Sequence, residues 1–408
     1  MWRALRHRNY RLFYGGQSIS LIGTWLTRVA TGWLVYRLTD DALVLGLAAF
    51  AGQIPTFVLA PFAGVLIDRW NRHRVLVVTQ VCSLVQSALL AWFALRGTID
   101  VPHVIVLNVM QGLINAFDTP ARQVFVVEMI EDRADLANAI ALNSSMVNAA
   151  GLIGPSVAGV LIAAVGEGWC FAIDAASYLA VLASLLAMRV TPRPRPAVQR
   201  ELLDDLNEGA RYVAGHAAIR SLLLLLAIVS LMGMPYLVLM PMIATDVFGG
   251  GADTNGFLMS ASGVGALAGA VYLARRGTVR GLGTVIALAA AGFGAGLIVF
   301  SRSTSLWLAL PVLVVTGFAM IAHMAATNTV IQTLVDEDKR GRVMSFYTMA
   351  FFGTRPFGSL IAGGLAASMG APATLLIGGA TCVLAAIGFA RALPAIRRDP
   401  RVAAATAT

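Results

Sequence analysis

The sequence predicts an all-α integral membrane protein whose twelve transmembrane helices form two pseudo-symmetric six-helix bundles. Three observations predict it: an apolar composition, a succession of span-length apolar segments, and an uneven distribution of basic residues. Of the 408 residues, 58% are hydrophobic and 12% are charged, whereas about a quarter of a typical soluble protein is charged. We therefore expect a lipid bilayer to surround most of this chain.

Twelve segments are long and apolar enough to cross a bilayer core, which takes about 20 residues of helix. Their apolar residues do not follow the ten-residue alternation of membrane barrels. The segments are residues 12–37, 43–67, 75–95, 101–127, 139–165, 169–188, 221–245, 254–274, 281–300, 305–327, 343–368 and 372–393.

Basic residues gather on one side of these spans. An even number of spans places both termini on the same side, and 25 of the 30 Arg and Lys residues fall in the segments on that side. Because cytoplasmic loops are enriched in Lys and Arg, the sequence predicts a multi-pass protein of the cell (inner) membrane with both termini cytoplasmic. The basic N-terminus has no cleavage site after it, so we expect it to enter the first span uncleaved.

The longest polar break divides the spans six and six. It opens with alternating prolines and ends with an amphipathic segment near 201–214. A weak repeat supports the division, because QGLINAFD (111–118) matches TGFAMIAH (316–323) and GLIGPSVAG (151–159) matches RPFGSLIAG (355–363). The predicted organisation is an N-terminal bundle at 1–190, a cytoplasmic linker with an amphipathic helix at 191–220, a C-terminal bundle at 221–400 and a disordered tail at 401–408.

Two kinds of motif connect the chain to a known family. GVLIDRWNRHRVL (64–76) resembles the loop signature of the major facilitator superfamily, with Asn71 in place of its usual glycine and His73 in place of a basic residue. NAFDTPARQ (115–123) and RGRVMSFY (340–347) resemble the bacterial export branch that includes enterobactin exporters. This resemblance runs almost end to end, and it implies the superfamily's fold and export driven by proton entry.

The resemblance also implies a gating role for the charged loop, which would brace the two halves in the outward-open state. An arginine and a carboxylate form strong charge-assisted bonds, and Glu128 and Glu131 are candidate partners for Arg72. The alternative is that the arginines, Arg74 among them, only anchor the loop on the cytoplasmic side. The predicted cytoplasmic gating residues are Gly64, Asp68, Arg69 and Arg72.

Asp118 and His323 are the candidate proton-coupling residues. They occupy equivalent positions of the repeat, so pseudo-symmetry would place them on opposite walls of one cavity. Ionisable groups within spans are costly and usually functional, and histidine titrates near physiological pH. The alternatives are structural: an ion pair of Asp118 with Arg122, and a hydrogen-bonded His323 in a helix interface.

Other polar and aromatic groups within the spans are candidates for a substrate cavity. Two arginines within the spans, Arg28 and Arg355, could each attract an anionic substrate or pair with Asp118 or Asp174. Asp174 itself is expected to reach the membrane interface. The candidate cavity residues are Arg28, Arg355, Asn115, Gln111 and Trp25. A span-four arginine of many drug–proton antiporters is absent here, because Asn108 takes its position.

Two prolines are candidate helix kinks. Pro155 and Pro356 each lie among glycines within a predicted span. Proline removes a backbone donor and bends a helix, while glycine lets helices pack closely. We expect these two sites to bend the helices that move during transport.

These features predict a secondary active transporter that exports a small amphipathic organic molecule, siderophore-like or drug-like, by alternating access with protons as the coupling ion. A proton-coupled importer or uniporter of a small metabolite stays open, as does a non-transporting membrane sensor on the same scaffold. The few scattered histidines argue against an enzyme, and the absence of a phosphate-binding loop favours an ion gradient as the energy source. We expect no cofactor, no metal and no nucleic-acid partner, and a monomer in the lipid bilayer. Three separate cysteines read as small apolar residues.

Overall fold

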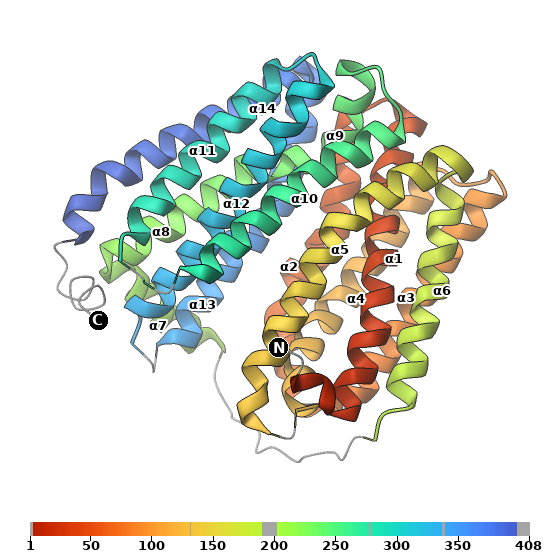
Figure 1. Ribbon diagram of the computed structural model, residues 1–408, viewed down its shortest axis with the longest axis horizontal. Coiled ribbons are helices and arrows are strands. Elements are labelled where there is room, and N and C mark those ends of the chain that lie inside the picture. The colour runs from red at the N-terminus through yellow and green to blue at the C-terminus, as the bar shows by residue number, and fades with distance from the viewer. Residues whose placement is uncertain are drawn as a thin grey trace. The chain divides into compact units, whose positions relative to one another are not determined.

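The structure is a computed structural model that describes residues 3–130, 132–189, 202–276, 278, 280–336 and 339–397. Most of these residues are helical, and none of them lies in a strand. The helices of the first half are α1 (Arg8–Thr39), α2 (Ala42–Arg69), α3 (Arg72–Leu95), α4 (Val101–Glu128), α5 (Leu136–Val165) and α6 (Glu167–Leu186) (Figure 1). Those of the second half are α7 (Leu202–Gly215), α8 (Ala217–Ile228), α9 (Met240–Met242), α10 (Ala252–Arg275), α11 (Leu282–Arg302), α12 (Leu306–Leu334), α13 (Arg340–Thr348) and α14 (Arg355–Arg397).

Each of the twelve predicted spans coincides with a helical segment. Within the described part of the chain, nine helices are long and apolar enough to cross a membrane. One of them, Arg340–Pro394, has 55 residues and contains predicted spans eleven and twelve. Its backbone leaves the helical conformation at Gly370, between these two spans. α1 and α4 lie outside the nine. Each carries ionisable residues within its apolar stretch, which lowers its hydropathy.

The seventh span is interrupted. After α8 the chain passes through a π-helical turn (Val229–Gly233), a 3₁₀ turn (Met234–Leu237), the short α9 and a second π-helical turn (Ile243–Val247). Pro235 and Pro241 lie in this stretch and have no backbone N–H to donate. Interrupted helices of this kind are frequent in transporters, where they supply backbone groups to binding sites.

The repeat in the sequence is also a repeat in the backbone. Gly166 separates α5 from α6 with φ 85° and ψ 170°, and Gly370 bends α14 with φ 82° and ψ 160°. The two glycines are equivalent, because each follows the last glycine of its GLIGPSVAG or RPFGSLIAG motif at the same spacing. Glycine adopts a positive φ without a steric penalty, so both turns are encoded by residue type.

The chain divides into two compact units. Unit 1 comprises Met1–Asp40, Ala48–Val198 and Gly250–Ser260, and unit 2 comprises Asp41–Leu47, Gln199–Gly249 and Ala261–Thr408. The short segments 41–47 and 250–260 thus group apart from the rest of their helices, α2 and α10. The domain boundaries expected from the sequence stay a prediction.

Helix packing within each unit follows the small residues. In unit 1, α6 packs along α1 and α3, and α5 packs along α1 (Figure 1). Gly16 and Gly23 of α1 lie directly against Ser184 and Ser177 of α6, so the two helices approach closely. In unit 2, α11 packs on both α12 and α14. Large apolar side chains such as Val106, Leu186 and Leu288 are exposed, as expected for helices in lipid.

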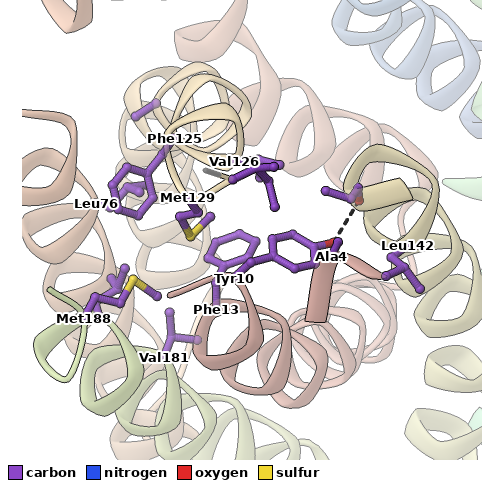
Figure 2. Close-up of a cluster of buried hydrophobic side chains, with 14 of the residues drawn as sticks. Ala4, Tyr10, Phe13, Leu76, Phe125, Val126, Met129, Leu142, Val181 and Met188 are labelled. Carbon is purple, nitrogen blue, oxygen red and sulfur yellow. Dashed lines mark hydrogen bonds between the residues drawn. The ribbon is translucent and has the colours of Figure 1, made fainter. Parts of the chain in front are cut away.

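One end of unit 1 has a dense apolar core. We call this end, where α3 begins and α4 ends, the basic end. Tyr10 and Phe13 of α1 pack there with Phe125 of α4, with Met129 just after α4 and with Met188 (Figure 2). The Tyr10 hydroxyl donates to the Ala139 carbonyl at 2.8 Å, so this buried phenol is satisfied. The core holds the start of α1 against the end of α4.

A side chain caps the first turn of α3 and another caps the first turn of α4. At the basic end Asn71 caps α3 and accepts a hydrogen bond from the Arg74 backbone N–H at 3.2 Å. At the opposite end Asp100 caps α4 and accepts from the His103 backbone N–H at 3.0 Å. That hydrogen bond lowers the pKa of the Asp100 carboxyl. Asn and Asp are preferred at this position because their side chains satisfy a free N–H of the first turn.

Candidate functional site

The charged loop brings Arg72 onto a carboxylate. Arg72 is the first residue of α3, and its guanidinium donates to Glu128 at the end of α4. Arg72 is 7% exposed, so the pair lies in protein rather than in water. His73 forms a hydrogen bond with the Leu185 carbonyl at 2.8 Å and joins α3 to α6. Glu128 is one of the two acids expected to pair with Arg72, and Glu131 lies outside the described residues.

Three predicted gating residues are described only through their backbone. Positions 64, 68 and 69 lie in the last turns of α2, but the surroundings of Gly64 and the side chains of Asp68 and Arg69 are not among what the structure describes. The gating role of the loop therefore stays a prediction, resting on the Arg72–Glu128 pair and the resemblance.

Arg28 and Trp25 of α1 lie together, with the Trp25 ring against α5. The Trp25 ring lies over Gly151 and Gly154, where any Cβ would meet it. The Arg28 guanidinium lies 4.8 Å from the centroid of this ring, a cation–π distance. Arg28 is an exposed side chain near the middle of a long helix, and none of the ion pairs among the described residues involves it. A substrate-binding role for Arg28 and Trp25 stays a prediction.

Gln111 and Asn115 form a polar ladder on α4. The Gln111 amide donates to the Asn115 carbonyl oxygen at 3.0 Å and lies 3.4 Å from the Ser83 hydroxyl of α3. Both side chains are half-buried. Asn108, one turn earlier, donates to the Ala48 carbonyl of α2 at 3.2 Å. It therefore acts as a link between helices at the position where drug–proton antiporters carry arginine.

Asp118 has a complete set of partners. One carboxylate oxygen accepts hydrogen bonds from the Thr79 hydroxyl and the Gln80 amide of α3, both at 2.8 Å. The other oxygen pairs with Arg122, one turn further along α4. The ion pair that the sequence offered as the structural alternative is therefore present. A proton-coupling role for Asp118 stays a prediction.

His323 faces the equivalent neighbour in unit 2. It is 1% exposed on α12, and the main chain of Ile286 on α11 faces its ring. Neither ring nitrogen has a hydrogen bond of normal geometry among the described residues. Because Asp118 faces α3 and His323 faces α11, the repeat extends to the helix that each side chain contacts. Each residue is directed toward a neighbour within its own unit, and the proton role of His323 stays a prediction.

Arg355 lies at a break in the helix rather than within one. α13 passes into a π-helical turn, Met349–Gly353, and α14 begins at Arg355. The guanidinium lies 4.1 Å and 4.9 Å from the ring centroids of Phe351 and Phe352. Pro356 is the second residue of α14, where a missing N–H breaks no helical hydrogen bond. The interruption is the π-helical turn Met349–Gly353, which lies just before Pro356.

Pro155 lies in a helix that runs on through it. α5 is assigned as one helix from Leu136 to Val165, and Pro155 is buried within it. Its neighbour Ser156 forms a hydrogen bond with Ser260 of α10 at 2.6 Å, within unit 1. A pivot at Pro155 or Pro356 stays a prediction.

Asp174 corrects an expectation from the sequence. We expected it to reach the membrane interface, but it is 1% exposed. One of its oxygens, Oδ2, accepts hydrogen bonds from Thr27 of α1 at 2.7 Å and Ser87 of α3 at 2.8 Å. The position of an acid in FAIDAASY, two turns into an apolar span, was the signal for burial, and the three-helix packing around it could not be read from that string.

A further polar contact outside the spans was not foreseen. Glu208 of the amphipathic helix α7 pairs with Lys339 and with Arg342, the latter at 2.9 Å. Tyr212, one turn later, donates to Asp336 at 3.0 Å. The sequence predicts the amphipathic helix, but its docking partner lies more than 120 residues away.

A family model described as transmembrane secretion effector, within the major facilitator superfamily, matches residues 1–405. The chain is 25% identical to the staphyloferrin A transporter of Staphylococcus aureus, over 86% of this chain and 88% of that protein. It is 28% identical to the multidrug efflux pump Tap of Mycolicibacterium fortuitum, over 87% and 88%. It is 24% identical to the enterobactin exporter EntS of Escherichia coli, over 89% and 86%.

Solved transporters share the fold. An inward-facing, unoccupied bacterial homologue of the human lysosomal transporter Spinster superposes with a TM-score of 0.75 at 16% identity, covering 97% of this chain and 99% of that one. A D-xylose–proton symporter gives 0.68 at 14% identity, covering 95% and 96%. These likenesses confirm the predicted fold class. Together with the family match, they agree with the expectation of a transporter and not an enzyme.

Proposed function

Because the chain belongs to the transmembrane secretion effector family of the major facilitator superfamily, we propose that it exports a small amphipathic organic molecule by alternating access coupled to proton entry. Siderophores and drugs are the substrate classes that the names of its relatives suggest. In this proposal the basic end of the helices faces the cytoplasm, the lipid bilayer surrounds a monomer, and protons are the coupling ion.

The observation that carries the proposal is Arg28. An exposed guanidinium at mid-helix, held over the Trp25 ring, offers a charge for an anionic group and an aromatic face for an apolar one. A cation within a span is costly unless it faces a water-filled cavity or a partner. An amphipathic molecule with an acidic or catecholate group would use both features together.

The test is transport by the purified protein in liposomes under an imposed pH gradient. Internal pH and labelled-compound movement are followed while siderophores, macrolides and cationic dyes are added one at a time. Saturable proton movement that requires one compound supports coupled transport and identifies the substrate class. Exchange of labelled compound without proton movement contradicts proton coupling and leaves Asp118 and His323 without a role in it.

A matched pair of variants tests the arginine. Arg28→Gln should raise KM for anionic compounds by about tenfold, the equivalent of about 1.4 kcal/mol, and leave cationic dyes unaffected. Arg28→Lys keeps the charge and should keep most of the affinity. An equal effect of Arg28→Gln on anions and cations contradicts the proposed role. The sign of the proton movement relative to that of the compound separates an exporter from the importer that the sequence left open.

A further inference from the structure

Two of the buried carboxylates of unit 1, Asp118 and Asp174, have opposite surroundings. Asp118 is 2% exposed and has a cation, Arg122, together with two other donors. Asp174 is 1% exposed, and within the described part of the chain its hydrogen-bond donors are hydroxyl groups. A carboxylate taken out of water needs a counter-charge or a full set of hydrogen bonds to stay ionised. Asp118 has both a counter-charge and hydrogen bonds to both oxygens. Among the described residues, Asp174 has no counter-charge and hydrogen bonds to one oxygen.

One oxygen of Asp174 is left without a partner. Oδ2 accepts from Thr27 and Ser87, whereas Oδ1 is buried and has no hydrogen bond among the described residues. The Ser177 hydroxyl lies nearby but donates to the main-chain carbonyl of Asp174 at 2.7 Å. Oδ1 lies instead against Gly23 of α1, where an added Cβ would come within 2.7 Å of it.

Among the residues that the structure describes, no cation forms an ion pair with Asp174. On α6 itself the titratable neighbours are Cys170 and Tyr178, one turn to either side, and the Tyr178 phenol faces Thr24. On α1, Arg28 lies over Trp25 and Arg37 is paired with Glu167 at 2.7 Å. On α3 the basic residues lie at the far, basic end, and Cys82 is the other titratable group. α5 has no titratable residue along its length.

The fold does not require a carboxylate at this position. From the glycines at 166 and 370, the equivalent of Asp174 in the second half is Gly378, which lies against the Met232 carbonyl. The same packing of this helix against the first helix of its unit is thus made without any acid. A buried acid in one unit alone of this equivalent pair carries an energetic cost, which is typical of a functional residue within a span.

We propose that Asp174 is a proton-binding site, with the proton carried on Oδ1. The hydroxyls of Thr27 and Ser87 can donate to Oδ2 in both states, because Oδ2 is a carboxylate oxygen in the ionised form and the carbonyl oxygen in the form protonated on Oδ1. The site therefore accommodates both states without moving a helix. The three groups lie on α6, α1 and α3, which places proton uptake where these helices contact each other. This inference rests on the proposed function for its role in coupling, but proton binding itself can be measured separately.

Infrared difference spectroscopy of the purified protein, titrated between about pH 5 and pH 8, measures the proton directly. The wild-type protein should show a carboxylic acid C=O band that disappears as the pH rises. The band should be absent in Asp174→Asn, and unchanged in Asp118→Asn and in the exposed-residue control Asp132→Asn. A band that persists in Asp174→Asn, or that Asp118→Asn removes, overturns the inference.

A second set of spectra covers the case in which Asp174→Asn does not fold. In wild-type protein labelled with ¹³C-aspartate the band must shift, since it belongs to an Asp. Ser87→Ala and Thr27→Val keep the carboxyl but change its hydrogen bonding, so each should shift the band frequency. A band insensitive to both variants, or to the label, belongs to another group and overturns the inference.

Transport assays then test coupling. Asp174→Asn should lose pH-gradient-driven accumulation by at least tenfold, while exchange of labelled compound without a gradient stays within about twofold of wild type. Retained gradient-driven accumulation would overturn the coupling role. If the wild-type protein moves no compound at all, the proposed function fails, and the infrared band still decides whether Asp174 binds a proton.

Discussion

Arg72 shows how a single residue in a charged loop acquires a defined partner. Its guanidinium is buried at the first turn of α3 and pairs with Glu128, beside the apolar core that holds the ends of α1 and α4 (Figure 2). A buried ion pair contributes little net stability over apolar residues, but removing one partner leaves an uncompensated charge. The pair therefore specifies which residues meet at this end of the unit.

We expect Arg72→Gln to lower the free energy of unfolding by about 3 kcal/mol, because Glu128 then keeps its charge without a counter-charge. The double variant Arg72→Gln with Glu128→Gln should be less damaged than the sum of the two single variants. Thermal and denaturant unfolding in detergent measure this cycle. Arg74→Gln is the matched control in the same turn, since its side chain is exposed. Additive effects of the two single changes would show that the pair is not coupled.

The packing of α1 on α5 depends on glycine at a defined face. The Trp25 ring occupies the space in which Cβ atoms at Gly151 and Gly154 would lie, and Arg28 stacks on the same ring. The orientation of the candidate substrate arginine thus follows from two glycines on another helix. Outside the spans, α7 is likewise positioned by residues distant in the chain, because Glu208 pairs with Lys339 and with Arg342 of α13.

Gly154→Ala should destabilise the protein by about 1–3 kcal/mol, because the methyl group meets the Trp25 side chain. Gly15→Ala on α1 is the control, since nothing lies within 4 Å of the added carbon. Alanine favours a helix over glycine by about 1 kcal/mol, so this control should be neutral or slightly stabilising. Thermal unfolding compares the two variants, and an equal response would remove the close approach as the cause.

At the scale of the whole molecule, the distribution of basic residues predicts the orientation in the membrane. Thr98, in the turn after α3, and Ala134, near the start of α5, are both exposed and lie at opposite ends of unit 1. In a variant with the native cysteines Cys82, Cys170 and Cys382 replaced, a membrane-impermeant maleimide should label Thr98→Cys in spheroplasts and Ala134→Cys only after lysis. The reverse pattern would place the basic end outside the cell.

The sequence by itself determined the membrane class, the all-helical fold class, the repeat and the family. These properties follow from composition, segment length and residue type, which act locally. About 20 apolar residues suffice to predict a span, and glycine at equivalent positions permits the positive φ of the turns at Gly166 and Gly370. The acid partner of Arg72 was predicted to within two candidates, because it lies at the end of the neighbouring helix.

Only the tertiary structure decided how each ionisable group within the spans is accommodated. Asp118 and Asp174 are both acids in apolar spans, and the sequence offers a nearby cation, Arg122, to Asp118 alone. Packing adds Thr79 and Gln80 of α3 to Asp118 and surrounds Asp174 with Thr27, Ser87 and a glycine face. The physical reason is that the energy of a buried charge depends on groups from other helices, and these are brought together by three-dimensional packing rather than by neighbourhood in the chain.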